Sequence, residues 1–175
     1  MTTNTLMLKR IVSSDIDSLK TLSIRTFKET FENQNTVKNM DLYLSERMSK
    51  KALLNEIENP DSHFYFSYLK NKCIGYLKLN FNGAQTESVF NDNAFEIQRI
   101  YILKEFQGNG WGSQLFEKAI QLGMQKNYKK LWLGVWEMNY NALVFYQKKG
   151  FKAYGRHVFE LGTDSQIDIL MSLEL

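Results

Sequence analysis

The stretch from residue 95 to residue 119 limits the possible folds of this chain more than any other part. Residues 95–103 are rich in β-branched and aromatic side chains, which predicts a strand. Residues 107–112 then place three glycines in six positions, and an amphipathic pattern over residues 110–126 predicts a helix directly after them. A strand, a glycine loop and a helix in this order direct backbone N–H groups and the positive end of a helix dipole toward a phosphate.

The glycine loop allows more than one interpretation. Glycines in a short strand-to-helix turn often serve the backbone geometry alone. A Walker loop is excluded because Gly112 is followed by Ser113 and Gln114 rather than by Lys and then Ser or Thr. A dinucleotide-binding loop requires Gly-x-Gly-x-x-Gly, and Gly112 comes one residue too early for that pattern. The spacing that fits is Gln-x-x-Gly-x-Gly, formed by Gln107, Gly110 and Gly112.

The rest of the chain predicts further strands and helices without a domain boundary. Alternation around Leu6 and Leu8 predicts a first strand, and Ser14 is expected to cap a helix that runs to about residue 33. Other helical patterns cover residues 40–48, 50–58 and 139–149. Strands are expected at residues 63–69, 73–81, 130–136, 152–161 and 166–173, with a loop at 82–94 and a hairpin turn at 162–165. We therefore expect one domain over residues 1–175.

Composition places the chain among globular proteins. Hydrophobic residues make up 43% and aromatic residues 14% of its 175 residues, which is enough to build a core. The net charge of +3 arises from 22 basic and 19 acidic residues without a basic block, so we predict no nucleic-acid partner. The single cysteine, Cys73, excludes an internal disulfide, and no stretch has the composition of a signal peptide or a membrane span. We therefore expect a cytoplasmic protein that does not bind a membrane.

A second motif occupies residues 139–151, Asn-Tyr-Asn-Ala-Leu-Val-Phe-Tyr-Gln-Lys-Lys-Gly-Phe. It resembles the pattern Asn-x-x-Ala-x-x-Phe-Tyr-x-x-x-Gly-Phe of the GCN5-related N-acetyltransferases, the GNAT superfamily, and the glycine loop resembles motif A of the same superfamily. The order of the predicted elements is similar to this superfamily over nearly the entire chain. The resemblance implies an α/β fold (α+β in some schemes), with a central, twisted, mixed and mostly antiparallel sheet of about seven strands flanked by about four helices.

Three shorter segments narrow the resemblance. Residues 26–31, 96–102 and 132–137 are similar to those of the Pai-type bacterial spermine/spermidine N-acetyltransferases. This implies an enzyme that transfers acetyl from acetyl-coenzyme A (acetyl-CoA), without a metal, to a primary amine of a small polyamine by direct attack. Gln98 departs from these relatives, which often have Glu there, and this puts in doubt any scheme with two carboxylates on the strand. Two alternatives stay open: transfer to a peptide, protein or other small amine, and a non-catalytic CoA-binding sensor.

The predicted cofactor site combines the two motifs. Backbone N–H groups of residues 108–113 are expected to hold the diphosphate of acetyl-CoA, and the helix dipole adds about 0.3–1 kcal/mol of attraction. The resemblance implies that the main chain of three strand residues pairs with the pantetheine arm, and that the following helix flanks the cofactor. The expected cofactor-binding residues are Ile100, Tyr101, Ile102, Gln107, Gly108, Asn109, Gly110, Trp111, Gly112, Ser113, Asn139, Asn141, Tyr146 and Lys148.

The expected chemistry requires a base and an acid. A primary amine with a pKa near 10.4 costs roughly 4–5 kcal/mol to present in its neutral form at pH 7, and a base offsets that cost. Glu96 is the candidate base, directly or through water, and the alternative is a strand-end carboxylate in water or paired with Arg99. Strand alternation predicts that Glu96, Gln98 and Ile100 share one face. Tyr146 is the expected acid, which protonates the departing CoA thiolate.

The acceptor amine is expected to meet side chains from several elements: Phe31, Glu32, Gln98, Trp136 and His157. For His157, a structural role in a terminal strand is the alternative. No metal site is predicted, because His63 and His157 are the only histidines and neither has ligand spacing around it. Exposed hydrophobic residues leave a homodimer open as a further partner.

Overall fold

The computed structural model describes residues 5–88, 90 and 93–175. These residues form a sheet of seven strands in the spatial order β1-β2-β3-β4-β5-β7-β6. The strands are β1 (Met7–Arg10), β2 (Ser62–Leu69), β3 (Lys72–Asn80), β4 (Ala94–Ile102), β5 (Lys130–Trp136), β6 (Lys152–Leu161) and β7 (Asp164–Glu174). The helices are α1 (Ile16–Phe31), α2 (Val37–Arg47), α3 (Lys50–Glu58), α4 (Trp111–Gln125) and α5 (Tyr140–Lys148), with short 3-10 helices η1 (Ser13–Asp15), η2 (Glu32–Gln34), η3 (Asn82–Ala84) and η4 (Lys104–Phe106).

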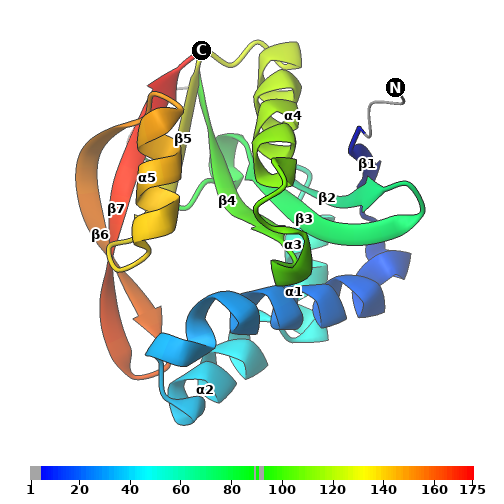
Figure 1. Cartoon of the computed structure of the whole chain (residues 1–175), viewed down its shortest axis with the longest axis vertical. Helices are drawn as coiled ribbons and strands as arrows, with labels where there is room; N and C mark the ends of the chain where they lie inside the picture. Colours follow the sequence, from blue (N-terminus) through cyan, green and yellow to red (C-terminus); the bar gives the residue numbers. More distant parts are fainter. Residues whose placement is uncertain (1–4, 89, 91–92) are drawn as a thin grey trace.

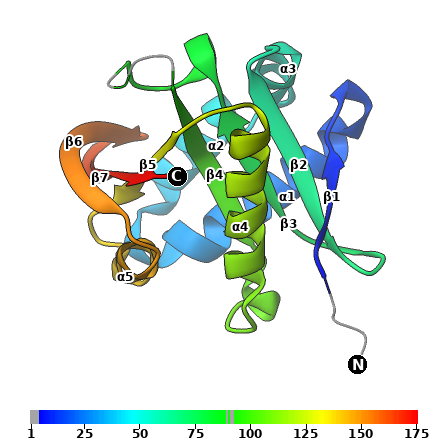
Figure 2. The same ribbon diagram turned by 90° about the horizontal axis from the view of Figure 1, so that it is seen from above.

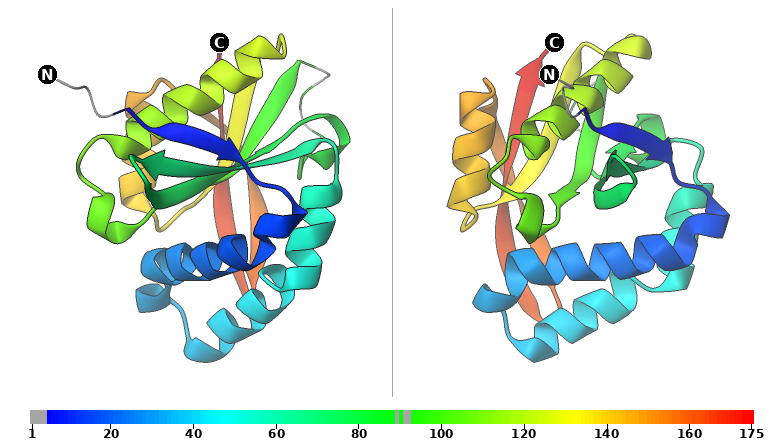
Figure 3. Two further views of the ribbon diagram at one scale, coloured as in Figure 1. Left: turned by 90° about the vertical axis from the view of Figure 1, so that its right-hand side faces the viewer. Right: turned by 45° about the vertical axis from the view of Figure 1, so that its right-hand side comes forward.

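Helices cover both faces of this sheet (Figures 1 and 2). Figure 3 shows α4 above the central strands and α1 and α2 below them. Neighbouring strands are antiparallel except for the central pair of β4 and β5, which is parallel. The predicted mixed, mostly antiparallel sheet is confirmed. The described residues form five α-helices, which agrees with the five helical segments predicted from the sequence and is one more than the resemblance implies.

Each face of the sheet has its own hydrophobic core. The core under α4 and α5 includes Leu115, Phe116 and Tyr146. The core under α1, α2 and α3 includes Leu19 and Leu53, which are fully shielded from solvent. Complete burial of a side chain of this size stabilises the fold by about 1.5–3 kcal/mol. The sheet is therefore held from both sides, and its central strands have fixed positions.

A bulge in β4 changes which side chains face which core. The register between β3 and β4 shifts by one residue, and Gln98 has no partner across this ladder. As a result, Ile97 and Ile100 both pack into the core under α4, whereas Tyr101 packs into the opposite core. The prediction that Glu96, Gln98 and Ile100 share one face is therefore wrong, because one extra residue reverses the face of every later side chain.

The central strands β4 and β5 pair over only a short length. Their register joins Ala94–Glu96 to Lys130–Trp132, and beyond these residues the two described strands separate (Figure 1). β4 stays paired with β3 up to Ile102, and β5 stays paired with β7 up to Trp136. An opening between β4 and β5 results, with a main-chain edge on each side, and α4 begins beside it (Figure 1).

Two local predictions need correction. Ser14 lies inside η1 and does not cap the first helix; the Asp15 carboxylate instead accepts a hydrogen bond from the Val12 N–H at 3.2 Å. The turn between β6 and β7 is shorter than residues 162–165, because β7 begins at Asp164. Residues 89, 91 and 92 of the predicted loop, and residues 1–4, lie outside the described residues. Over the described residues, every helix is too short or too polar to cross a bilayer.

Candidate active site

The loop before α4 presents a row of backbone N–H groups. Gly108 and Gly110 have φ angles of 78° and 80°, in the left-handed region that favours glycine. The N–H of Gln114 donates to the Gly110 carbonyl at 3.1 Å, but within the described part of the chain the N–H groups of residues 108–113 donate to no acceptor. No acidic residue lies in the first turn of α4. Free amides at an uncompensated helix N-terminus fit a diphosphate.

Side chains of the loop brace its backbone. Gln107 donates from Nε2 to the Ile102 carbonyl oxygen at 2.8 Å, and Asn109 donates from Nδ2 to the Gln107 carbonyl oxygen at 3.1 Å. The side chains of Gln107 and Asn109, predicted to bind the cofactor, therefore act here on the loop and on the end of β4. The Ile102 carbonyl, predicted to pair with the pantetheine arm, already accepts one hydrogen bond. The main-chain edge at Ile100 and Tyr101 lies along the opening.

Tyr146 lies on α5 among aromatic rings. Its ring centroid is 6.3 Å from that of Phe116, 5.1 Å from that of Phe145 and 5.4 Å from that of Phe151. Burial raises the pKa of the Tyr146 phenol well above its ordinary value, so the hydroxyl keeps its proton at neutral pH. Burial also raises the pKa of Tyr101 on β4, and the Tyr146 phenol adds to that shift. A hydroxyl that carries its proton at neutral pH can act as a general acid.

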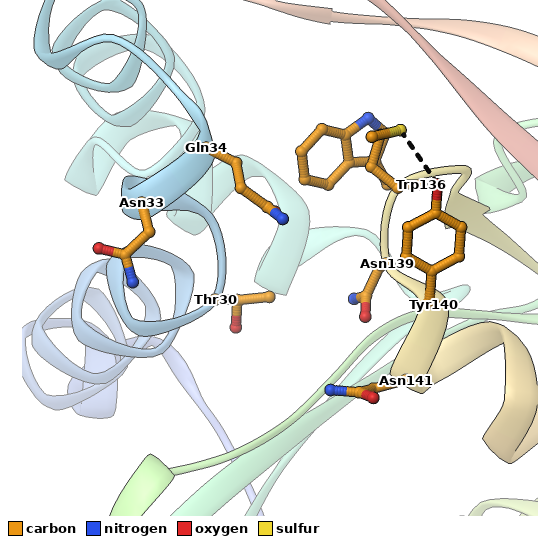
Figure 4. Close-up of a pocket in the computed structure, with 8 residues that line it drawn as sticks. Thr30, Asn33, Gln34, Trp136, Asn139, Tyr140 and Asn141 are labelled. Carbon is orange, nitrogen blue, oxygen red and sulfur yellow. Dashed lines mark hydrogen bonds between the residues drawn. The ribbon is translucent and has the colours of Figure 1, made fainter.

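A pocket of about 310 Å³ lies between the end of α1 and the start of α5. In Figure 4, Asn33 and Gln34 face Trp136, Asn139 and Asn141 across this pocket. The pocket therefore brings together Trp136, which was predicted to contact the acceptor amine, and Asn139 and Asn141, which were predicted to bind the cofactor. The complete lining is Thr30, Asn33, Gln34, Trp136, Met138, Asn139, Tyr140 and Asn141.

Other predicted residues of this region lie at or beyond the edge of the pocket. The Phe31 ring packs against the Trp136 ring with centroids 5.8 Å apart, so these two predicted acceptor residues meet. Glu32 is exposed and outside the lining. Asn139 also caps α5, because its Oδ1 accepts a hydrogen bond from the Ala142 N–H at 3.2 Å. Lys148 is exposed in the last turn of α5, at the opposite end of that helix.

Glu96 is a buried carboxylate with several donors around it. It accepts hydrogen bonds from the Asn80 side chain at 2.9 Å, from the Thr86 N–H at 2.8 Å and from the Thr86 hydroxyl at 2.6 Å. Burial raises the pKa of Glu96, and the donors offset only part of that shift. Asn80 also donates to Gln98 at 3.0 Å, so Glu96 and Gln98 belong to one network. This excludes the alternative of Glu96 in water or paired with Arg99.

Arg99 pairs with α3 instead. Its guanidinium donates to both oxygens of Glu56, at 2.7 and 3.0 Å, and Lys78 Nζ lies 3.1 Å from the same carboxylate. The side chains of Arg99 and Lys78 are only 8% and 5% exposed. Burial, and then the neighbouring Arg99, lower the pKa of Lys78 to about 8. The bulge turns Arg99 toward α3, so this ion cluster ties the open part of β4 to the helical layer.

A second polar group spans β6, β7 and the loop after η3. Nδ1 of His157 lies 2.7 Å from Glu87 Oε1, and Nε2 lies 3.4 Å from Asp168 Oδ2. Asp168 is the ladder partner of both His157 and Trp136, so all three face the same side of the sheet. Burial raises the pKa of Asp168, and His157 opposes that shift. In the described part of the chain, no His, Cys, Asp and Glu side chains are arranged to hold a metal ion.

The sequence pattern singled out His157 but neither of its carboxylate partners. Asp168 interrupts an apolar strand, and an acid in such a strand is a signal that sequence reasoning can use. Glu87 is partly buried, but it lies in an aperiodic loop, where no local pattern distinguishes it from solvent-exposed acids.

A sequence model of the acetyltransferase (GNAT) family matches residues 24–151. This chain belongs to that family. An uncharacterized N-acetyltransferase from the pepI 3' region of Lactobacillus delbrueckii subsp. lactis is 40% identical to this GNAT chain over 166 residues, which cover 95% of each protein. Family membership makes the chain an acyltransferase that depends on acetyl-CoA, as the sequence predicted.

Two more distant relatives come from Thermoplasma acidophilum. Its spermidine N(1)-acetyltransferase is 24% identical over 149 residues, which cover 83% of this chain and 87% of that protein. The crystal structure of a PaiA N-acetyltransferase in complex with coenzyme A matches with a TM-score of 0.78 and 23% identity, covering 98% of this chain and 99% of that chain. The second similarity establishes that the two proteins share the GNAT fold.

Proposed function

We propose that this GNAT enzyme acetylates a primary amine of a polyamine of the spermidine or spermine type. The observation that carries the proposal is the negative charge of three carboxylates on one side of the sheet, which we call the acceptor face. Glu96 on β4, Asp168 on β7 and Glu87 from the loop after η3 bring three carboxylates to one side of the sheet beside the opening. The nearby cations Arg99 and Lys78 are already paired with Glu56. An acceptor with several ammonium groups complements such a face.

A relative of low sequence identity supports the same class of acceptor. One relative is named a spermidine N(1)-acetyltransferase, but at 24% identity its acceptor does not carry over by itself. The acceptor face therefore supports a polyamine acceptor more strongly than the relative does, because it consists of this chain's own residues.

Cofactor binding in this proposal uses main-chain groups for the most part. The N–H groups of residues 108–113 hold the diphosphate, and the edge of β4 at Ile100 and Tyr101 pairs with the pantetheine arm. Bound acetyl-CoA supplies the acetyl group as an activated thioester. Asn141 and Lys148 approach from α5, and the Tyr146 hydroxyl donates its proton to the departing sulfur.

The base predicted from the sequence, Glu96, is engaged by hydrogen-bond donors. Both oxygens of Glu96 accept hydrogen bonds from Thr86 or Asn80. Glu96 can take a proton from an acceptor amine only if one of these bonds is lost, although its raised pKa favours protonation.

A thiol-release assay with acetyl-CoA and a panel of amines tests the proposal. We expect kcat/KM for spermidine and spermine to exceed that for a peptide α-amine, lysine or a monoamine of equal length by about tenfold or more, a difference of about 1.4 kcal/mol. Equal or better turnover of the peptide or the monoamine contradicts the polyamine acceptor and leaves the acyltransferase class intact. Coenzyme A binding by calorimetry without turnover of any amine identifies a sensor instead.

A further inference from the structure

We propose that His157 takes the proton from the acceptor amine, that Glu87 is the positioning residue that orients its imidazole, and that Glu96 fastens the loop that carries Glu87. The inference rests on the amine acceptor of the proposed function. It holds for any primary amine, whether or not that amine belongs to a polyamine. It also assigns the proton transfer to a residue other than the base predicted from the sequence.

The two ring nitrogens of His157 have unequal partners. Nδ1 lies 2.7 Å from Glu87 Oε1, which is a short, charge-assisted hydrogen bond. Nε2 lies 3.4 Å from Asp168 Oδ2, which is a long contact for a hydrogen bond. The proposal places the N–H of the neutral ring on Nδ1, where Glu87 accepts it, and the lone pair on Nε2. A carboxylate that orients an imidazole in this way makes Nε2 the general base of Ser-His-Asp hydrolases.

An exposed glycine of β5 lies next to Nε2. Gly134 is exposed in the middle of β5, although its neighbours Leu133 and Val135 are buried. A β-carbon at Gly134 would stand 3.7 Å from His157 Nε2 and 3.3 Å from Asp168 Oδ2, so both side chains lie over this glycine. At Gly134, β5 has already separated from β4. In this proposal, an amine that reaches Nε2 beside Gly134 faces the opening in which the pantetheine arm is proposed to lie.

Glu96 has a different role because it anchors a loop. Three consecutive residues tie the segment after η3 to three strands: Gln85 to Trp132 on β5, Thr86 to Glu96 on β4, and Glu87 to His157 on β6. The first two bonds are both 2.6 Å long. Glu96 thus acts on the acceptor through the loop, by holding Glu87 against the imidazole.

Among the described residues, two carboxylates contact the His157 ring: Glu87 from the loop and Asp168 on β7. Tyr154 on β6 interacts electrostatically with Glu87 and Glu96, and Tyr43 on α2 interacts with Asp168 and with the cation Arg99. Burial raises the pKa of both phenols, which keeps them neutral in the working range of pH. Glu87 and Asp168 are therefore the charged groups in contact with the ring.

The protons and electrons of this step balance. The acceptor ammonium gives one proton to Nε2, and its freed lone pair forms the C–N bond at the acetyl carbonyl carbon. The C–S bond breaks with its electrons on sulfur, and the Tyr146 phenol protonates that sulfur. A second proton from the amine nitrogen restores the phenol, and His157 returns its proton to solvent. One proton is released in each turnover.

The decisive measurement is the pH dependence of kcat/KM for His157→Asn, with His63→Asn as the matched control. His63 lies on β2 and contacts the Pro60 carbonyl, and burial lowers its pKa to about 4, so it titrates outside the assay range. We expect His157→Asn to lose about 10²–10⁴ in kcat/KM at neutral pH and to lack the acidic inflection of the wild type. His63→Asn should retain both. An unchanged acidic inflection in His157→Asn overturns the inference.

Two further pairs separate positioning from proton transfer. Glu87→Gln should shift the inflection and lower kcat, whereas Glu160→Gln, an exposed carboxylate on β6 bonded to Ser165, should do neither. Glu96→Gln should raise KM for the amine and keep the inflection. Loss of the inflection in Glu96→Gln but not in His157→Asn makes Glu96 the base and also overturns the inference.

The same data distinguish failure of the inference from failure of the proposed function. If the wild type acetylates no primary amine, the proposed function fails and the inference fails with it. If the wild type acetylates amines and His157→Asn retains the wild-type pH profile, the inference alone fails. If melting curves show that His157→Asn does not fold, the Glu87→Gln profile decides: a shifted inflection supports the inference and an unshifted one contradicts it.

Discussion

Replacement of Glu56 by Gln is expected to destabilise the fold more than any other single change of a surface-accessible charge in α3. One carboxylate serves two buried cations, Arg99 at 2.7 Å and Lys78 at 3.1 Å. Glu56→Gln keeps the size of the side chain and removes its charge. Arg99 and Lys78 then stay buried without a counter-charge. Removing one partner of a buried ion pair costs about 3–5 kcal/mol.

The magnitude follows from how each cation can respond. Lys78 can lose its proton, because its pKa is already lowered to about 8 by burial. At about 1.4 kcal/mol per unit of pKa, neutral Lys78 is accessible near pH 7, which limits its share of the loss. Arg99 cannot lose its proton and has to keep its charge. We therefore expect a loss of about 3 kcal/mol, at the lower end of the range.

Urea denaturation at neutral pH measures this loss, with Glu58→Gln as the control. Glu58 lies two positions further along α3 and is exposed, so its replacement should change the free energy of unfolding by less than about 0.5 kcal/mol. The melting temperature of Glu56→Gln should fall by about 6–12 °C, at about 2–4 °C for each kcal/mol. A loss below about 1 kcal/mol would refute the reasoning, because it would show that Arg99 and Lys78 do not need this carboxylate.

Three further predictions concern the acid, the glycine loop and pH. Tyr146→Phe should lower kcat by about 10²–10⁴ and leave coenzyme A affinity within about twofold; an unchanged kcat removes its role as acid. Gly110→Ala should destabilise the fold by about 1 kcal/mol because of its φ of 80°, whereas Gly112→Ala, where a β-carbon meets open space, should be neutral or stabilising in the same melts. The unfolding free energy should rise with pH from about 8 toward 10, since burial lowers the pKa of Lys78 from 10.5 to about 8 and the unfolded chain binds more protons between these values. Lys78→Met should flatten that rise, and a slope that persists in this variant contradicts the assignment.

The sequence by itself determined the features that depend on near neighbours. The positive φ angles of Gly108 and Gly110, the free N–H groups before α4 and the cap at Asn139 all arise within a few residues of chain. The order of strands and helices likewise follows from periodicities of 2 and 3.6 residues, which a single sequence displays. The resemblance to the GNAT superfamily rested on these same local patterns.

Only the tertiary structure decided which side chains share the acceptor face. The bulge at Gln98 reverses the alternation of β4, and no local pattern marks where an extra residue enters a strand. Glu87 and His157 are 70 positions apart and Arg99 and Glu56 are 43 apart, so their pairing depends on strand register and loop path. The sequence therefore predicted a carboxylate base on β4. In the fold, that carboxylate accepts a hydrogen bond from Thr86 of a loop, and the imidazole of His157 lies near Gly134, the one exposed residue among those described in β5.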